Sequence, residues 1–329
     1  MKHLVRTTPL SVESIRPSDA LKRFHAAAIR DSKMLREGLL ASECPACGGD
    51  SVPAFEREGF WYRECRRCES VFAAPRPSVD AVSRFYATTE AGRLRTKYFQ
   101  AAGQERLNHV VRSRVDWVAN YVAGARPDNV RLLDVGTLYP SFLAELRNQG
   151  VAGACDSLDP PEGLETDARA AGAQVGTPPT IASVDVVTAF EQLEHQSDPG
   201  AFLRRLKGVL KPGGWLFATT RSISGLDLQV LWDKAPYIFV PEHLNLLSVE
   251  GLTTLFEAAG FAIVELSTPG QLDVELIERS AQDFDIPLPR MLRYLFRHRG
   301  DECRADLQEL LQRHRLSSHV RIAARVPTA

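Results

Sequence analysis

The chain has 329 residues, enough for two domains or for one large α/β domain with additions. Its 44% hydrophobic and 25% charged residues are typical of ordinary soluble proteins, and its formal charge of -1 predicts no general attraction to nucleic acid or to an anionic membrane. The first residues show no secretory signal pattern, and no apolar run approaches the roughly 18 residues of a membrane span. We therefore expect a cytoplasmic protein without a membrane anchor.

The N-terminal part is predicted to contain three segments. Residues 1–42 form an arm, because apolar side chains in 19–40 recur at three- and four-residue steps, as on an amphipathic helix. Residues 43–80 are rich in Cys, Gly and Pro around short aromatic stretches, which predicts small hairpins held by a metal. Residues 81–127 are predicted to be a helical linker or substrate lid that ends in the loop GARPD.

Two CxxC pairs, Cys44 with Cys47 and Cys65 with Cys68, are separated by 17 residues, a spacing typical of zinc sites. Each pair fits a tight turn that points two thiolates at one ion, and two such turns close a tetrahedral site with no open position. The sequence therefore predicts a structural Zn²⁺ in a zinc ribbon. An iron-sulfur cluster, two redox-active pairs and four unrelated core cysteines remain as alternatives.

Residues 128–268 alternate between apolar runs and helical patterns, which indicates βαβ units and an α/β, Rossmann-like, doubly wound parallel sheet. Strands are expected at 131–135, 151–158, 184–190, 215–219 and 261–266, and helices at 141–148, 162–171, 199–210 and 252–259. In residues 269–329 we expect a mostly helical insertion followed by one further edge strand at 319–325.

The loops that follow Val135, Leu158 and Phe190 are the predicted ligand site, because ligands of open α/β sheets lie at the carboxyl ends of the strands. A dinucleotide site would place GxGxxG after the first strand. This chain has Gly136-Thr-Leu-Tyr-Pro-Ser141 there, which disfavours a dehydrogenase.

Several motifs in order resemble the class I S-adenosylmethionine-dependent methyltransferases, in the subgroup with an N-terminal four-cysteine zinc module that often acts on sugars or other small metabolites. The resemblance covers roughly residues 43–268. It is carried by CPACGG and YRECRRCESVFAAPRPS, then LLDVG, SLDPPEGLETDAR, DVVTAFEQLEHQSDPGAFLRRLKGVLKPGGWLFATT and PEHLNLLSVEGLTTLFEAAGF. It implies S-adenosyl-L-methionine as cofactor, a methyltransferase activity and a small-molecule substrate, possibly a sugar or nucleotide-sugar.

The resemblance also implies roles for single residues. Asp134 and Gly136 would lie at the methionine end of the cofactor, and Asp159 would accept hydrogen bonds from both ribose hydroxyls. Phe190 and Glu191 would face the transferable methyl group.

The candidate catalytic base is His243, next to Glu242 in the sequence PEHLNLLS, because an imidazole suits proton removal at neutral pH. It resembles the Glu-His pair of the sugar C-methyltransferases in this family. A structural role within the loop is the alternative for His243. We expect His195 to make a structural hydrogen bond, and Tyr86 either packs or reaches the acceptor pocket.

Two departures from the family pattern support a second hypothesis, a noncatalytic or cofactor-impaired zinc and Rossmann scaffold. Leu138 and Pro140 stand where the family usually carries glycines, and residues 176–180 lack the acidic residue that commonly meets the adenine. A third hypothesis, an RNA methyltransferase, is disfavoured because residues 43–80 carry five arginines against seven acidic residues. The oligomeric state is not indicated by the sequence.

Overall fold

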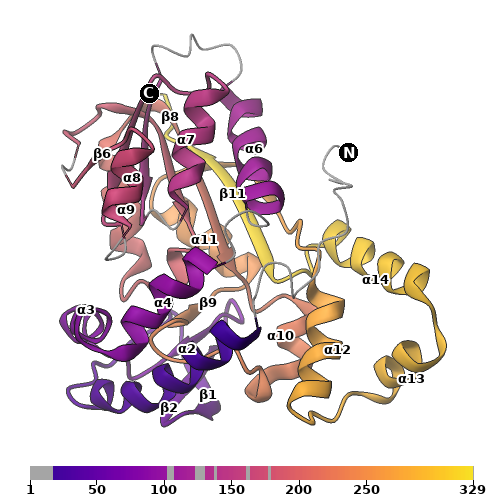
Figure 1. The fold of residues 1–329 in the computed structure, drawn as a ribbon. Coiled ribbons are helices and arrows are strands. Elements are labelled where there is room, and N and C mark those ends of the chain that lie inside the picture. The colour runs from indigo at the N-terminus through magenta and orange to yellow at the C-terminus, as the bar shows by residue number, and fades with distance from the viewer. Residues whose placement is uncertain are drawn as a thin grey trace.

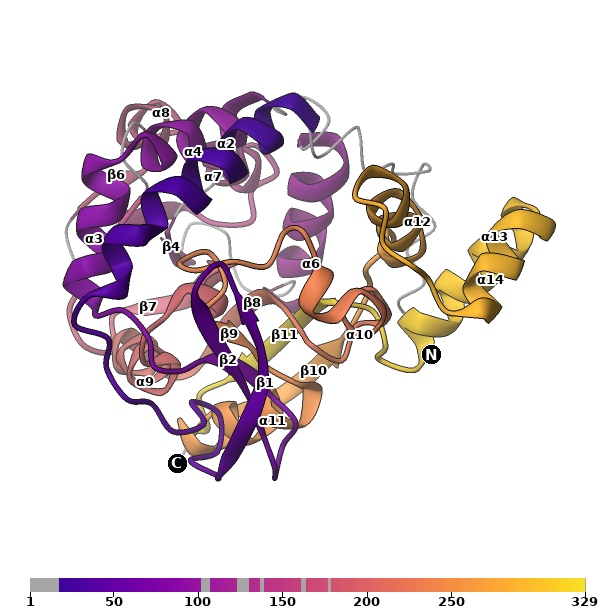
Figure 2. The same ribbon diagram turned by 90° about the horizontal axis from the view of Figure 1, so that it is seen from below.

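The computed structural model describes residues 18–101, 107–122, 130–136, 139–160, 164–176 and 179–328. A seven-stranded sheet forms its centre, with helices on both faces (Figures 1 and 2). The strand order is β10-β11-β8-β7-β4-β5-β6. The strands are β4 (Arg131–Val135), β5 (Ala154–Leu158), β6 (Gln174–Val175), β7 (Val184–Phe190), β8 (Leu210–Arg221), β10 (Ala262–Ser267) and β11 (His319–Arg325). The predicted α/β class is confirmed.

Strand pairing brings the predicted ligand loops to one edge of this sheet. Strand β4 is parallel to both β5 and β7, with Val135 opposite Leu158 and Asp134 opposite Thr188. Strand β7 is in turn parallel to β8, with Phe190 opposite Thr219. The carboxyl ends of four neighbouring strands therefore lie side by side.

The final strand has the predicted bounds, but its predicted place at the edge is wrong. Strand β11 lies between β8 and β10 and is antiparallel to both. Its side chains Val320, Ile322, Ala323 and Ala324 are fully buried. A run of apolar residues that is covered on both faces belongs in the interior of a sheet, since an edge strand leaves backbone groups unpaired.

Helices pack on both faces through two separate apolar cores, as expected of a doubly wound sheet. One core joins the sheet to α9 (Pro199–Val209) and α11 (Val249–Ala258). The other joins it to α6 (Arg112–Val122) and α7 (Pro140–Asn148). The side chain of Asp198 caps α9 by accepting a hydrogen bond from the Ala201 N–H at 2.8 Å, as the sequence predicts. The short helix α8 (Glu165–Ala170) lies beside α7.

A second, four-stranded sheet has the order β1-β2-β3-β9. Strands β1 (Ser51–Arg57), β2 (Phe60–Cys65) and β3 (Val71–Ala73) come from the predicted zinc segment. The fourth strand, β9 (Asn245–Leu246), follows the predicted base His243 in the chain and pairs with β3. The zinc segment and the segment of the candidate base therefore share one sheet.

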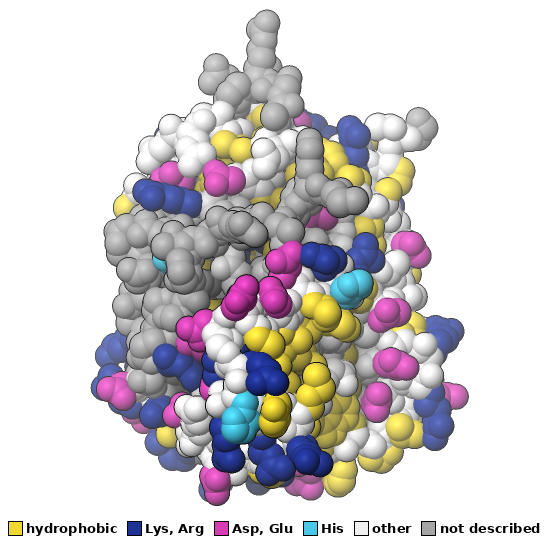
Figure 3. Space-filling model, turned by 90° about the vertical axis from the view of Figure 1, so that its right-hand side faces the viewer, with side chains coloured by type: hydrophobic (Ala, Val, Ile, Leu, Met, Phe, Trp, Pro, Cys, Tyr) yellow, Lys and Arg dark blue, Asp and Glu magenta, His cyan; other side chains and the backbone are white. Residues whose placement is uncertain are grey.

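The remaining helices form two additions to the core. The N-terminal part contains the helices α2 (Ser18–Asp31), α3 (Val79–Thr88) and α4 (Glu90–Ala101) and the helical turns Ser32–Arg36 and Leu107–Val111. The C-terminal half contains the helices α10 (Leu226–Leu231), α12 (Asp273–Asp283), α13 (Arg290–His298) and α14 (Asp301–Arg313) and the turns Leu193–His195 and Trp232–Lys234. In Figure 1, α13 and α14 project from the body, and Figure 3 shows apolar and charged side chains mixed on that side. None of the described helices combines the length and apolarity needed to cross a membrane.

Candidate functional site

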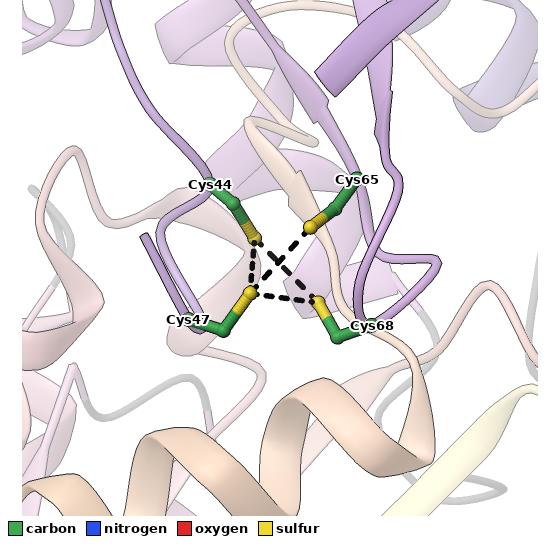
Figure 4. Close-up of side chains that lie close together, drawn as sticks. All are labelled: Cys44, Cys47, Cys65 and Cys68. Atoms are coloured by element: carbon green, nitrogen blue, oxygen red, sulfur yellow. Dashed lines mark hydrogen bonds between the residues drawn. The ribbon is translucent and has the colours of Figure 1, made fainter. Parts of the chain in front are cut away.

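The four predicted metal-ligating cysteines converge at the base of the small sheet (Figure 4). Four of their Sγ–Sγ distances are 3.5 to 3.7 Å, and all four sulfur atoms lie within 4.8 Å of one another. A tetrahedral ion with Zn–S bonds of about 2.3 Å requires sulfur atoms about 3.8 Å apart. The donor set and its spacing fit a single Zn²⁺ ion better than a cluster of several irons, whose ligands stand farther apart.

The cysteine cluster is built into the core and does not lie on a free module. Cys44, Cys65 and Cys68 are buried in the same apolar core as α9 and α11. The hydroxyl of Ser248, which caps α11, donates to the carbonyl of Cys68, and the Ser248 N–H donates to Ser70 Oγ at 3.0 Å. The predicted metal site therefore connects β3 with the start of α11.

The residue after each of three parallel strands adopts a left-handed backbone conformation. These residues are Gly136 (φ 71°), Asp159 (φ 50°) and Glu191 (φ 54°), which were predicted from sequence to meet the cofactor. Left-handed backbone costs a non-glycine residue about 1 kcal/mol or more, and such strain gathers at functional sites. The Asp159 side chain is exposed at the end of β5. Three predicted cofactor residues thus lie together along one edge of the sheet.

Asp134 and Phe190 are buried, at 4% and 5% exposure. Thr188 Oγ1 donates to Asp134 Oδ1 at 2.5 Å, which connects the ends of β4 and β7. The Phe190 ring lies edge-on to Phe142, with 5.1 Å between centroids, and beneath the guanidinium of Arg114. Both residues line a hollow of only about 10 Å³ beside Gly136.

The space above Gly136 is taken by a side chain of this chain. A Cβ atom at Gly136 would collide with the amide of Gln192, which donates hydrogen bonds to the carbonyls of Phe190 at 3.1 Å and Gly136 at 3.4 Å. Pro140, expected to crowd the loop, is the first residue of α7, where proline is favoured. Leu138 lies outside the described residues, as does part of the 176–180 stretch.

A cavity of about 290 Å³ lies beyond the ends of β7 and β8. It receives side chains from distant parts of the chain, including α2, α6, α12 and β11. The candidate base His243, its neighbour Glu242, and Glu191 and His195 all line it. The structure therefore brings the two predicted catalytic residues into one cavity with Glu191.

Glu242 is the centre of a buried polar network. Its Oε1 accepts a hydrogen bond from Arg95 Nε at 3.0 Å in an ion pair and another from the Tyr86 hydroxyl. Burial alone would raise the pKa of Glu242, but the positive charge of Arg95 and these hydrogen bonds lower it below the ordinary value. Tyr86 therefore contacts Glu242, which lines the cavity.

His243 is held at its backbone from both sides. Its N–H donates to the Phe239 carbonyl at 2.9 Å, and its carbonyl accepts a hydrogen bond from the Tyr62 hydroxyl of β2 at 2.7 Å. Its ring centroid lies 6.4 Å from that of His195. Burial lowers the pKa of His195, although the charge of Glu242 opposes this shift.

Glu191 and Glu194 have opposite pKa shifts. Burial would raise the pKa of Glu191, but the charges of His319 and Arg114 lower it to about 2. Arg114 Nη2 lies 2.7 Å from Glu191 Oε1 and supplies the cation at neutral pH, because burial lowers the pKa of His319 to about 4. Burial and the charge of Glu191 raise the pKa of Glu194, so Glu194 keeps its proton to a higher pH. Such a split is typical of acid and base pairs in active sites.

Sequence reasoning missed several residues of the site. Arg114, Glu194 and Arg321, which line the cavity, and Arg95, which pairs with Glu242, were not predicted as site residues, although all are wholly or partly buried charged groups. Their positions in helices and strands give no local sign of burial. The one available signal was that Glu194 adjoins His195 in the motif EQLEH.

Comparisons with known proteins identify a methyltransferase domain over residues 104–266. The chain is similar to the ubiquinone biosynthesis O-methyltransferase of Xanthomonas axonopodis pv. citri (strain 306), 30% identical over 141 residues, which cover 39% of this chain and 57% of that protein. It is also similar to the protein of the same name from Aeromonas salmonicida (strain A449), 24% identical over 192 residues, with 53% and 80% covered. Among solved structures, an S-adenosylmethionine-dependent methyltransferase from Archaeoglobus fulgidus is 14% identical at a TM-score of 0.43, covering 68% of this chain and 97% of that one. The chain thus spans little more than half the length of the Xanthomonas relative.

Proposed function

Because residues 104–266 match a methyltransferase domain, we propose that the chain transfers a methyl group from S-adenosylmethionine to a small metabolite. The observation that carries this proposal is the position of the cavity. Glu191, at the end of β7, lines the cavity, and Gly136 and Asp159 follow the neighbouring strands β4 and β5, so that a cofactor along this edge would present its methyl group to an acceptor in the cavity.

Three strand ends supply the cofactor contacts in this proposal. The exposed carboxylate of Asp159 would accept hydrogen bonds from the ribose hydroxyls, and Asp134 and Gly136 would bound the methionine end. The bound cofactor supplies an electrophilic methyl group on a sulfonium. Phe190 and Glu191 would lie near that methyl group, with Glu191 held by Arg114.

His243 is the proposed base. Methyl transfer is an in-line displacement, so the protein mainly aligns acceptor and methyl group and removes a proton from the acceptor. The hydrogen bonds to Phe239 and Tyr62 fix the backbone of His243 beside the cavity. Glu242 positions this segment through Arg95 and Tyr86, and its negative charge favours the protonated imidazole that forms after proton removal.

The acceptor is proposed to be small, and an oxygen atom is the favoured acceptor atom. A cavity of about 290 Å³ is at the lower limit of ligand pockets, which begin at about 300 Å³. A single sugar or aromatic ring fits this space, whereas the nucleotide of a nucleotide-sugar would have to lie outside it. The relatives named ubiquinone biosynthesis O-methyltransferase support transfer to oxygen.

We assign a structural Zn²⁺ to Cys44, Cys47, Cys65 and Cys68 in this proposal. Four thiolates complete the tetrahedral coordination of zinc, so the ion would have no open position for substrate or water. Its contribution would be to hold β2 and β3 in place, and through them the segment that carries His243.

A noncatalytic scaffold is the second candidate, and one observation favours it. The Gln192 amide fills the space above Gly136, and the hollow beside it holds only about 10 Å³. The methionine portion of S-adenosylmethionine could bind there only if Gln192 and its neighbours moved. The two candidates therefore differ in whether S-adenosylmethionine binds at all.

Calorimetric titration with S-adenosylmethionine and S-adenosylhomocysteine separates the two candidates. We expect both compounds to bind the wild type and D159A to bind them about 10- to 100-fold more weakly, because a charge-assisted hydrogen bond is lost. D167A, which removes an exposed carboxylate from α8, is the matched control and should bind as the wild type does. If neither compound bound at high micromolar concentration, the methyltransferase would be ruled out in favour of the scaffold.

A further inference from the structure

The wall of the cavity formed by α6, β8 and β11 is rich in arginine. Arg114, Arg221 and Arg321 all line it, next to His319. Two of these arginines have carboxylate partners. Arg114 pairs with Glu191 at 2.7 Å, and Arg221 pairs with Asp227 at 3.2 Å.

Arg321 lacks such a partner. Its Nη2 donates to Ser113 Oγ at 2.6 Å, and its guanidinium carbon lies 5.3 Å from the ring centroid of Trp117. Its Nε is buried without a hydrogen-bond partner, and among the described residues no carboxylate comes within ion-pair distance of it. Burial, assisted by the charge of Arg114, lowers the pKa of Arg321 to about 10, while the more distant charges of Glu265 and Glu191 oppose this shift, and Arg321 remains a cation at neutral pH. A buried cation is unfavourable unless an anion compensates it.

His319 responds to the same excess of positive charge. Burial is the main reason for its low pKa, and Arg321, Arg114 and Arg221 all lower it further, while Glu191 opposes them. At neutral pH the imidazole of His319 is therefore uncharged and adds no positive charge to that of the three arginines. Since Arg114 and Arg221 are paired with carboxylates, Arg321 is the charge at this wall that can attract an anion.

We propose that the methyl acceptor carries an anionic group, a carboxylate or a phosphate monoester, which Arg321 and Ser113 bind at the β11 wall of the cavity. This inference rests on the proposed function, because it assigns the anion to the acceptor and not to the cofactor. A planar guanidinium with free donors matches either anion in a two-point geometry, and the Ser113 hydroxyl adds a donor beside it.

The sheet register gives the distance over which the acceptor extends. Arg321 is opposite Thr219 of β8, and Thr219 is opposite Phe190 at the end of β7. Neighbouring strands lie about 4.8 Å apart, so the anionic group lies roughly 10 Å from the strand end where methyl transfer is proposed. A compact molecule with a nucleophile at one end and an anion at the other fits this distance.

The test uses three probes, namely benzoate, inorganic phosphate and neutral benzamide, which matches benzoate in size, titrated calorimetrically into the full chain. We expect at least one anion to bind the wild type about 10- to 100-fold more tightly than R321Q, as the loss of a charge-assisted hydrogen bond requires. Arg321-dependent binding of benzoate would identify a carboxylate, and of phosphate a phosphate monoester. Benzamide should not distinguish the two proteins.

Two further variants control for a loss of anion binding that is caused by misfolding of R321Q. S113A keeps the buried cation of Arg321 and should weaken anion binding severalfold. R325Q removes an exposed arginine from the other end of the same strand and should bind anions as the wild type does. Equal anion binding by the wild type, R321Q and S113A would overturn the proposal.

Titration with S-adenosylhomocysteine separates this inference from the proposed function. R321Q should bind it as the wild type does, and a loss of affinity would place Arg321 in the cofactor site and overturn the proposal. Conversely, a wild type that binds anions through Arg321 but does not bind S-adenosylhomocysteine would contradict the methyltransferase and support the anion site alone.

Discussion

Glu242 is a buried carboxylate whose charge is balanced by Arg95, a residue 147 positions earlier in the chain. Removing one partner of such a pair leaves the other charge buried without compensation, which costs about 3–5 kcal/mol. We therefore expect R95M to lower the free energy of unfolding by that amount in urea denaturation. R93M, an exposed arginine on the same helix, should change it by no more than about 0.5 kcal/mol. Equal effects of the two substitutions would contradict a stabilising role for the ion pair of Arg95 with Glu242.

The same pair predicts how stability depends on pH. The pKa of Glu242 lies below its ordinary value of 4.5 in the folded chain, so the unfolded chain takes up the proton first as the pH falls. The stabilisation by Glu242 is therefore complete above the ordinary pKa and is lost as the pH falls through the folded pKa. We expect the wild type to be more stable than E242Q at neutral pH and the difference to shrink below about pH 5. Denaturation series of both proteins across this range provide the measurement.

His243 is expected to affect catalysis and not cofactor binding. A positioned general base contributes about 10²- to 10⁴-fold, so H243Q should lower kcat by that factor with the acceptor that the wild type methylates. Its affinity for S-adenosylhomocysteine should not change. H298Q removes an exposed histidine from α13 and serves as the control. If H243Q retained full activity, the structural role within the loop would be the correct one for His243.

At the scale of elements, pairing of β3 with β9 connects the cysteine cluster to the candidate base. The Ala73 N–H donates to the Leu244 carbonyl at 2.9 Å, and Tyr62 holds the carbonyl of His243. We expect C65S to lose bound zinc and to increase hydrogen exchange both in β3 and in residues 239–247. C303S, in α14, is the control and should retain zinc and protection. Increased exchange confined to β1–β3 would show that the cluster does not support the base.

Elements with a strong local pattern were predictable from the sequence. The bounds of β4, β7 and β11 agree with the prediction, because each is a short apolar run between polar turns. The two-residue strands β6 and β9 were missed, since two residues show no periodicity. The order of strands was harder to predict, because pairing partners depend on tertiary packing, although the apolar residues Val320 and 322–324 of β11, which point to both faces of the strand, were a sign of an interior strand.

The candidate site was predictable where it follows the strand ends and not where it depends on distant segments. Asp159 and Glu191 could be placed because a parallel sheet aligns its carboxyl ends. The ion pairs of Arg95 with Glu242 and of Arg114 with Glu191 could not be predicted, since these arginines come from helices whose packing leaves no local pattern in the sequence.

At the scale of the whole molecule, the cysteine cluster and the methyltransferase domain share one apolar core. Cys44, Cys65 and Cys68 pack with α9, α11 and strands of the large sheet. A bound metal stabilises the folded state of every part that unfolds together with its site. We therefore expect a metal chelator to lower the midpoint of a single cooperative thermal transition, with circular dichroism of secondary structure and of aromatic side chains changing together. Two separate transitions, the first involving only residues 43–80, would contradict this and would mean that the zinc ribbon folds as an independent domain. The wild type with added zinc is the control, and restoring the ion should restore the original midpoint, because mass action relates stability to the concentration of any ligand that binds only the folded chain.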